Sequence, residues 1–338
     1  MKTETIILFL SCYSLIFSLS PQATGPNTAT WIGDSLPYIG TKTLKQLTIP
    51  GTHDSGTYWL DETPMPGDSA PWIEAATVVG EALFVPTSWI IKGWSHSQDQ
   101  IFYNQMKGGM RYFDVRSGWD NKTQTWVVHH YVEGRPISEL LGNISQYLQD
   151  YPKEVVIVEM THFDGYPTQA NIAQLKNMAL QILGNYIYPI NTAFNFTLND
   201  WVNSGKRAIV TMESGAADGI WPGECIYNTY ADSPVIKTMI NFNTATVAQY
   251  MNGTWANELF KVSWTLTPDA DTVFQGAELG KPHTLIELAD SGNPYLPQFW
   301  LNMKAQGYRV GNILIIDHYE QSSIMQVIYD MNGIPVNN

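Results

Sequence analysis

Short apolar runs recur along the chain and alternate with segments in which apolar residues repeat at a helical period. The runs, which are rich in β-branched residues, lie at 44–49, 110–115, 125–128, 155–160, 208–212, 260–264 and 313–316. The amphipathic segments lie at 137–148, 171–183 and 297–306. Continuous apolar strands that alternate with helices are typical of a parallel sheet covered by helices. With 338 residues, the pattern predicts a single α/β domain of the (β/α)8 type, a TIM barrel.

One stretch does not follow this pattern. Residues 63–97 contain Pro, Trp and Gly without clean periodicity. They predict a long loop inserted near the mouth of the barrel. Its aromatic residues Trp72, Phe84, Trp89 and Trp94 either touch lipid or pack under the loop, and we expect packing.

The first residues have the pattern of a secretory signal peptide. A short basic start precedes an apolar segment at 6–19, and small residues follow it. A membrane anchor is the alternative, but a spanning helix needs ~20 apolar residues and this segment is interrupted by Ser and Cys. We therefore expect a signal peptide at 1–23, a catalytic barrel at 24–338, and a secreted product.

Charge narrows the range of partners. The chain has 31 Asp and Glu against 18 Lys and Arg, a formal net charge of -13. This balance disfavours binding to a phosphate backbone, so nucleic acid is not an expected partner, and it disfavours tight docking on anionic membranes. Four Asn-x-Ser/Thr sequons, at Asn121, Asn143, Asn195 and Asn252, fit a secreted glycoprotein.

Ionisable residues cluster where the predicted strands end. The cluster comprises His53, Asp54, Asp114, Arg116, His129, His130, Glu159, His162, Glu213, Asp317 and His318. The starts of the same runs carry no matching group. Because barrel enzymes build their sites at the carboxyl ends of the strands, the sequence predicts an active site at that face.

Two histidines from different strands, with an arginine and carboxylates between them, suit general acid–base chemistry at phosphorus. One neutral imidazole takes a proton from the nucleophile, and a second, charged one protonates the leaving oxygen. A guanidinium stabilises the charge that develops on the phosphoryl oxygens, and carboxylates orient the rings. None of these steps requires a metal ion.

Three motifs carry a resemblance to a known family. The segment TIPGTHDSGT at 48–57 resembles the opening motif of the phosphatidylinositol-specific phospholipase C (PI-PLC) X-domain family. MRYFDVR at 110–116 is similar to its second motif and VHH at 128–130 to its third, in the same order. The resemblance extends from about residue 44 to 317. It implies a distorted (β/α)8-type barrel, which agrees with the fold predicted from the strand and helix pattern.

The resemblance also implies roles for individual residues. His53 is similar to the general base that takes the proton from the inositol 2-hydroxyl, and His130 to the general acid for the leaving alkoxide. Arg116 would hold the phosphoryl oxygens. Asp54 and Asp114 would assist the acid and the arginine, and Asp317 would orient the base. The implied products are diacylglycerol and a cyclic inositol phosphate, which water opens in a second, slower step.

The same motifs indicate which cofactor class the chain resembles. Calcium-dependent members of the family carry Asn after the first His and a Glu-x-Asp pair in the second motif. Here these places hold Asp54 and the segment DVR at 114–116, so that the Arg116 guanidinium stands where a calcium ligand would be. The resemblance therefore implies a metal-independent site without a cofactor.

Headgroup recognition is expected from Glu159, Glu213 and Trp264 at the ends of later strands. Carboxylates accept hydrogen bonds from sugar hydroxyls, and an indole stacks on a ring. The alternatives are that both glutamates pair with buried arginines and that Trp264 belongs to the core. By strand alternation His129 faces away from His130 and is structural, whereas His162 has no assigned role.

Taken together, these features predict a secreted phosphodiesterase that cleaves phosphatidylinositol-like lipids at a membrane or micelle surface and acts as a monomer. Two alternatives stay open. One is a catalytically silent barrel that binds a phosphoinositide or a glycan, which has no need of a matched acid and base. The other is a phosphodiesterase for a different headgroup.

Overall fold

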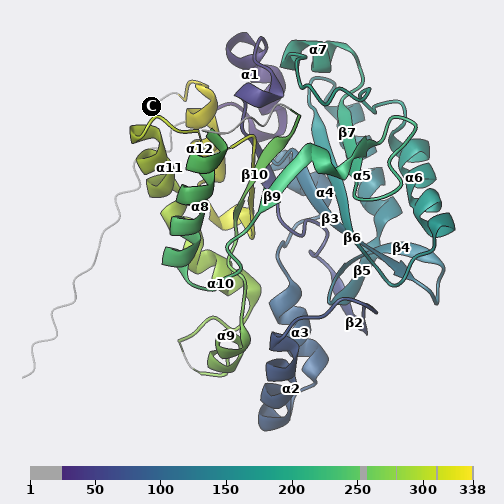
Figure 1. Ribbon diagram of the computed structural model, residues 1–338, viewed down its shortest axis with the longest axis vertical. Coiled ribbons are helices and arrows are strands. Elements are labelled where there is room, and N and C mark those ends of the chain that lie inside the picture. Colours follow the sequence, from purple (N-terminus) through teal and green to yellow (C-terminus); the bar gives the residue numbers. More distant parts are fainter. Residues whose placement is uncertain (1–24, 252–256, 279, 310, 337–338) are drawn as a thin grey trace, which may run out of the picture.

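The computed structural model describes residues 25–251, 257–278, 280–309 and 311–336 (Figure 1). The predicted signal peptide at 1–23 lies outside these ranges, as does the sequon at Asn252. Within them, no helix is long and apolar enough to cross a membrane.

A ring of parallel strands forms the centre of the molecule. Its order is β8 (Trp221–Pro222), β7 (Ala208–Met212), β6 (Val156–Asp164), β3 (Tyr112–Asp120), β1 (Ile49–Thr52), β11 (Ile313–Ile316), β10 (Leu259–Trp264) and β9 (Ile226–Thr229). Every pair in this order is parallel. In the described part of the chain, β8 and β9 do not pair, so the ring is open there. The predicted fold class, a distorted α/β barrel, is confirmed.

Three further strands extend the ring from β3. β4 (Thr125–His130) pairs antiparallel with β3, β5 (Val132–Pro136) with β4, and β2 (Leu60–Pro64) with β5. This small antiparallel extension explains how His130 reaches the barrel mouth although β4 is not one of the parallel strands.

Helices cover the outside of the ring (Figure 1). The three predicted helical segments correspond to α5 (Ile137–Asp150), α6 (Gln169–Leu183) and α11 (Leu296–Ala305). The pattern missed others, which are α1 (Trp31–Ile39), α4 (Phe102–Lys107), α7 (Leu198–Asn203), α8 (Ile236–Met251), α10 (Leu285–Gly292) and α12 (Ile324–Asn332). In α8 the buried stripe includes Asn243, which donates to the Ser263 carbonyl oxygen, so a polar residue interrupts the apolar period.

Residues 63–97 are not the loop that the sequence predicts. They contain α2 (Trp72–Leu83) and α3 (Thr87–Ser95), a helical hairpin that projects from one end of the molecule beside α9 (Ala270–Gln275) (Figure 1). The expectation of packed aromatics holds for half of them. Trp72 and Trp94 are buried, whereas Phe84 at the hairpin tip is 95% exposed and Trp89 is 58% exposed. Phe84 adopts a left-handed backbone conformation (φ 56°) that ends α2 and allows the tight turn.

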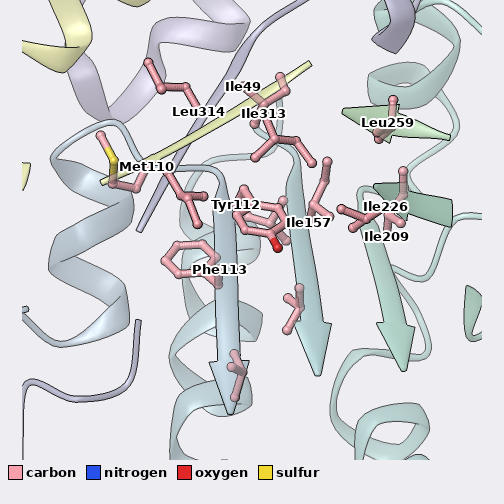
Figure 2. Close-up of a cluster of buried hydrophobic side chains, with 14 of the residues drawn as sticks. Ile49, Met110, Tyr112, Phe113, Ile157, Ile209, Ile226, Leu259, Ile313 and Leu314 are labelled. Atoms are coloured by element: carbon pink, nitrogen blue, oxygen red, sulfur yellow. The ribbon is translucent and has the colours of Figure 1, made fainter. Parts of the chain in front are cut away.

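The interior of the ring is apolar at the amino-terminal ends of the strands (Figure 2). Ile49, Ile157 and Ile313 come from three different strands and are fully buried together. Gly51 allows β1 and β3 to approach, because a Cβ there would lie 2.6 Å from Cδ1 of Tyr112. The core therefore fills the bottom of the barrel and leaves the carboxyl ends for polar side chains.

Candidate active site

A pocket opens at the carboxyl ends of the strands, as the distribution of ionisable residues predicts. His53 follows β1, Asp114 and Arg116 lie on β3, and His130 ends β4; all four line it. The rest of the wall comes from Trp72, Trp94, Tyr131, His162, Asn228, Tyr230, Asp232, Ser263, Thr265, Leu266, Thr267, Pro268, Leu285 and Ile315. The structure thus brings together chemistry-bearing residues that are far apart in the sequence.

Asp54 joins the site into one network. Its Oδ1 accepts a hydrogen bond from Arg116 Nε at 2.6 Å, and its Oδ2 lies 3.3 Å from His130 Nδ1 and 3.4 Å from His53 Nε2. Burial alone would raise the pKa of this carboxyl, but the charges of Arg116 and the two histidines outweigh burial and hold its pKa well below its usual range. A buried, ionised carboxylate therefore lies between both rings and the guanidinium.

His53 is oriented by Asp317, which follows β11. His53 Nδ1 donates to Asp317 Oδ1 at 2.8 Å, and this assigns Nε2 to the exchange of protons with a substrate. Burial alone would lower the pKa of His53, but Asp54 and Asp317 outweigh it and raise the pKa to about 9. At neutral pH the His53 ring is therefore in its charged, doubly protonated form.

His130 has the opposite protonation state. Its Nδ1 donates to the carbonyl oxygen of Ser95 at 2.7 Å, which leaves Nε2 free to face the substrate. The centroids of the His130 and Tyr131 rings are 4.6 Å apart. Burial lowers the pKa of His130 to about 4, because the nearby Asp54 only partly compensates and Arg116 adds to the decrease. The proton of the pair thus resides on His53, the inverse of the starting state that the resemblance implies.

Arg116 and Asp114 share one face of β3, two residues apart. The Arg116 side chain is 17% exposed. Burial alone would lower its pKa, but the charges of neighbouring groups, among them Asp54 and Asp114, outweigh burial and raise the pKa above its usual value. Asp114 is buried, and its backbone N–H donates to Ser55 Oγ at 2.9 Å. The pocket therefore offers a permanent cation flanked by carboxylates.

The three predicted substrate-binding residues do not line this pocket. Glu159 lies within β6 rather than at its end, and its Oε2 pairs with Lys261 Nζ at 2.6 Å and accepts from the Tyr112 hydroxyl. The alternative of a buried arginine partner is wrong in the residue type, because the buried cation that pairs with Glu159 is Lys261. Burial raises the pKa of Glu159, and the Lys261 charge opposes this.

Glu213 and Trp264 also have partners outside the pocket wall. The carboxylate of Glu213 accepts from the backbone N–H groups of His162 and Phe163, at 2.7 and 2.9 Å, and so binds the carboxyl-terminal part of β6. Trp264 is buried, and its ring lies 5.0 Å from that of Phe299 on α11. Alternation explains this position, because Ser263 on the same strand faces the pocket and its neighbour must face the helices.

Sequence reasoning missed several wall residues. His162 had no assigned role, yet it lines the pocket, and burial and Arg116 lower its pKa to about 4. Asn228, Tyr230 and Asp232 belong to β9 or directly follow it, and β9 was not predicted. A four-residue strand of mixed polarity gives no periodic signal, so its position became visible only in the folded chain.

Backbone strain accumulates around the pocket. Asp54, Tyr131, His162 and His318 adopt left-handed conformations, with φ values of 42°, 62°, 51° and 46°. Residues other than glycine persist in this region only where neighbouring contacts hold them, and such residues are concentrated at functional sites. Each of the four lies in or directly beside a segment that carries a residue of the site.

Two groups among the described residues are close enough to hold a metal ion. They are His53, Asp54 and Asp114, and Asp68, His129 and Asp164. In the first group the Arg116 guanidinium already neutralises Asp54. In the second, both nitrogens of His129 face oxygen acceptors, Asp68 Oδ2 at 2.7 Å and the His162 carbonyl at 2.8 Å. Internal partners therefore engage part of the donor set in each group, namely Asp54 Oδ1 in the first and both His129 nitrogens in the second.

The fold and the site define a PI-PLC-like α/β barrel. A family model described as phosphatidylinositol-specific phospholipase C, X domain, matches residues 88–205. The chain is 26% identical to PI-PLC X domain-containing protein 3 of Mus musculus over 315 residues, which cover 90% of this chain and 94% of that protein. It is 23% identical to PI-PLC X domain-containing protein 2 of Mus musculus over 333 residues, 93% of this chain and 92% of that one.

A solved structure has the same fold. The PI-PLC of Listeria monocytogenes superposes with a TM-score of 0.63 at 22% identity, over 91% of this chain and 99% of that one. The chain is thus similar in sequence to proteins with a PI-PLC X domain and similar in fold to a bacterial PI-PLC.

Proposed function

We propose that this protein is a secreted, metal-independent phosphodiesterase that cleaves phosphatidylinositol-like lipids to diacylglycerol and a cyclic inositol phosphate. One observation carries the proposal: a single buried carboxylate, Asp54, lies against two histidines and an arginine at the rim of one pocket. A binding protein has no need of two histidines that face one shared carboxylate. An enzyme that must both take and give a proton does.

In the proposed reaction the inositol 2-hydroxyl oxygen attacks the adjacent phosphorus. Its proton passes to His53 Nε2, and the bond from phosphorus to the glycerol oxygen breaks as His130 protonates that oxygen. Arg116 stabilises the charge on the non-bridging oxygens. Water then opens the cyclic ester with the two histidines in exchanged roles.

The location of the proton sets a requirement for this mechanism. Because the resting proton is on His53, substrate binding must move it to His130 before the attack. The negative charge of a bound phosphodiester favours the charged form of His130. Asp54 Oδ2, at 3.3 and 3.4 Å from the facing nitrogens, is the group placed between the two rings. It is therefore the candidate to stabilise both proton positions.

The pocket wall favours a headgroup without further phosphates. Asn228, Ser263, Thr265 and Thr267 offer amide and hydroxyl groups, and Asp232 adds a carboxylate. These groups match the hydroxyls of a polyol ring. Among the lining residues, Arg116 is the permanently charged cation, and the reacting phosphate occupies it in the proposed reaction. A ring that carries extra phosphates would face carboxylates without compensation.

The α2–α3 hairpin gives a means of contact with the lipid surface that carries this substrate. Trp72 and Trp94 connect it to the pocket wall, while its tip exposes Phe84 and Leu83. Full burial of a Phe contributes about 1.5–3 kcal/mol, or roughly tenfold or more in affinity. We therefore expect Phe84→Ser to weaken activity on phosphatidylinositol/phosphatidylcholine vesicles by about tenfold.

The control for the hairpin is a soluble substrate. Activity of Phe84→Ser on inositol 1-(4-nitrophenyl phosphate) is expected to equal that of the wild type, because this substrate needs no surface. Leu301→Ser removes an apolar side chain on α11 that is 53% exposed and lies outside the hairpin, and it should leave both activities unchanged. If Phe84→Ser and the wild type were equally active on vesicles, the hairpin tip would not be the part that contacts the lipid surface.

Phosphorus NMR tests the proposed function directly. Protein mixed with phosphatidylinositol micelles and excess chelator is expected to produce a cyclic phosphate resonance, since Arg116 supplies the charge that a metal would supply. Product that forms only after calcium is added would contradict the assignment of Asp54 and Arg116. Lipid binding without turnover in either condition would favour the silent barrel, and turnover of another phosphodiester alone would favour a different headgroup.

A further inference from the structure

Asp68, in the turn before α2, binds the strand end that carries His130. Its Oδ2 accepts hydrogen bonds from His129 Nδ1 at 2.7 Å and from the backbone N–H of Tyr131 at 2.6 Å. These two residues flank His130 on either side. The Asp68 side chain is 8% exposed and that of His129 is fully buried, so water competes little for the shared oxygen.

The flanking residues determine where the His130 ring points. As strand alternation predicts, the ring of His129 contacts Asp68 while His130 faces the pocket. Tyr131 has a left-handed backbone (φ 62°), and its ring lies over His130. Such a conformation is strained and persists only where neighbouring contacts hold it. Here the Tyr131 N–H donates to Asp68, and the Tyr131 carbonyl oxygen accepts a hydrogen bond from the Met65 N–H at 3.0 Å.

We propose that Asp68 is a positioning residue for His130: by binding both neighbours of this histidine, one carboxylate oxygen fixes the direction in which the ring enters the pocket. The inference rests on the proposed function, in which His130 protonates the leaving oxygen. Asp68 does not line the pocket, so it acts through His129 and Tyr131. Its charge also supports the protonated form of His130, opposing the decrease that burial causes in the pKa of this ring.

The leaving group distinguishes this role from a purely structural one. Phosphatidylinositol releases an alkoxide, which needs a proton from His130, whereas inositol 1-(4-nitrophenyl phosphate) releases a nitrophenoxide, which does not. Asp68→Ala is expected to lower kcat about 30-fold on the lipid and less than about threefold on the nitrophenyl ester. The ratio of the two kcat values does not depend on the fraction of protein that is folded.

Three variants complete the experiment. His130→Ala removes the general acid itself, so it should lower kcat on the lipid more than on the nitrophenyl ester and gives the largest difference expected between the two substrates. Asp68→Asn keeps an oxygen for the Tyr131 N–H and should retain more lipid activity than Asp68→Ala. Asp164→Asn is the matched control, because Asp164 lies 3.8 Å from His129 Nε2 on the far side of that ring. Its kcat ratio is expected to equal that of the wild type.

The outcomes separate the two levels of the proposal. Equal losses on both substrates in Asp68→Ala, or the same altered ratio in Asp164→Asn, would overturn the positioning role while the wild type still turns over lipid. A wild type that turns over neither substrate would overturn the proposed function, and the positioning role with it.

Discussion

Replacement of His53 by alanine is expected to lower kcat for phosphatidylinositol cleavage by about 10³-fold. The physical reason is the loss of the general base that Asp317 orients: His53 Nδ1 donates to buried Asp317, and Nε2 is left to receive the proton of the attacking hydroxyl. The loss should appear equally with the lipid and with inositol 1-(4-nitrophenyl phosphate), because both reactions begin with the same attack. Initial rates on the two substrates measure it.

Two further variants control this experiment. His53→Gln keeps a side-chain donor for Asp317, which is fully buried, and so separates loss of the base from an unpaired carboxylate in the interior. His283→Ala removes an exposed histidine whose ring faces the Gly276 carbonyl, away from the site, and should retain full activity. If His53→Gln kept more than a tenth of wild-type activity, another group would have to be the base.

Arg116→Lys is expected to lower kcat by about 10²-fold or more with a smaller change in KM. Lysine keeps the charge beside Asp54 but lacks the planar fork that binds two phosphoryl oxygens at once. The charge on these oxygens grows in the transition state, so the loss falls mainly on kcat. Initial rates at several lipid concentrations separate the two constants.

The matched control for this variant is Arg135→Lys. Arg135 makes an ion pair with Glu139 at the surface, where lysine is an adequate substitute, so its activity should not change. A further variant, Arg116→Ala, tests the contribution of Arg116 to stability. It leaves Asp54 buried without its guanidinium, and the free energy of unfolding should fall by about 3 kcal/mol. An Arg116→Lys enzyme with more than a third of wild-type kcat would exclude a role for the fork.

The residues at the strand ends show how much of the site the local sequence pattern could predict. His53, Arg116 and His130 each lie next to an apolar run, and the face that each presents follows from alternation over a few residues. Their meeting in one pocket follows from the barrel, which gathers the carboxyl ends of its strands. Glu159 was misplaced because β6 continues to Asp164, so that this glutamate lies below the strand end.

The helical hairpin illustrates a second limit. Residues 72–95 form helices whose apolar residues are divided between a buried side and an exposed tip, as Trp94 and Phe84 demonstrate. Because the apolar residues do not all lie on one face of each helix, the sequence lacks the single apolar stripe by which an amphipathic helix is recognised. The aperiodic composition was real, but it reflected two environments rather than the absence of secondary structure.

By itself, the sequence determined the barrel class, the position of the site at the strand ends, and the two histidines, the arginine and Asp54 as its candidates, because these follow from short-range periodicity and motif order. Only the tertiary structure decided which charges pair. Glu159 meets Lys261 from a strand 102 positions away, and Asp54 reaches both rings at once. It also decided where the proton rests, since burial and the distance to neighbouring charges set the pKa of each histidine, and neither exists until the chain has folded.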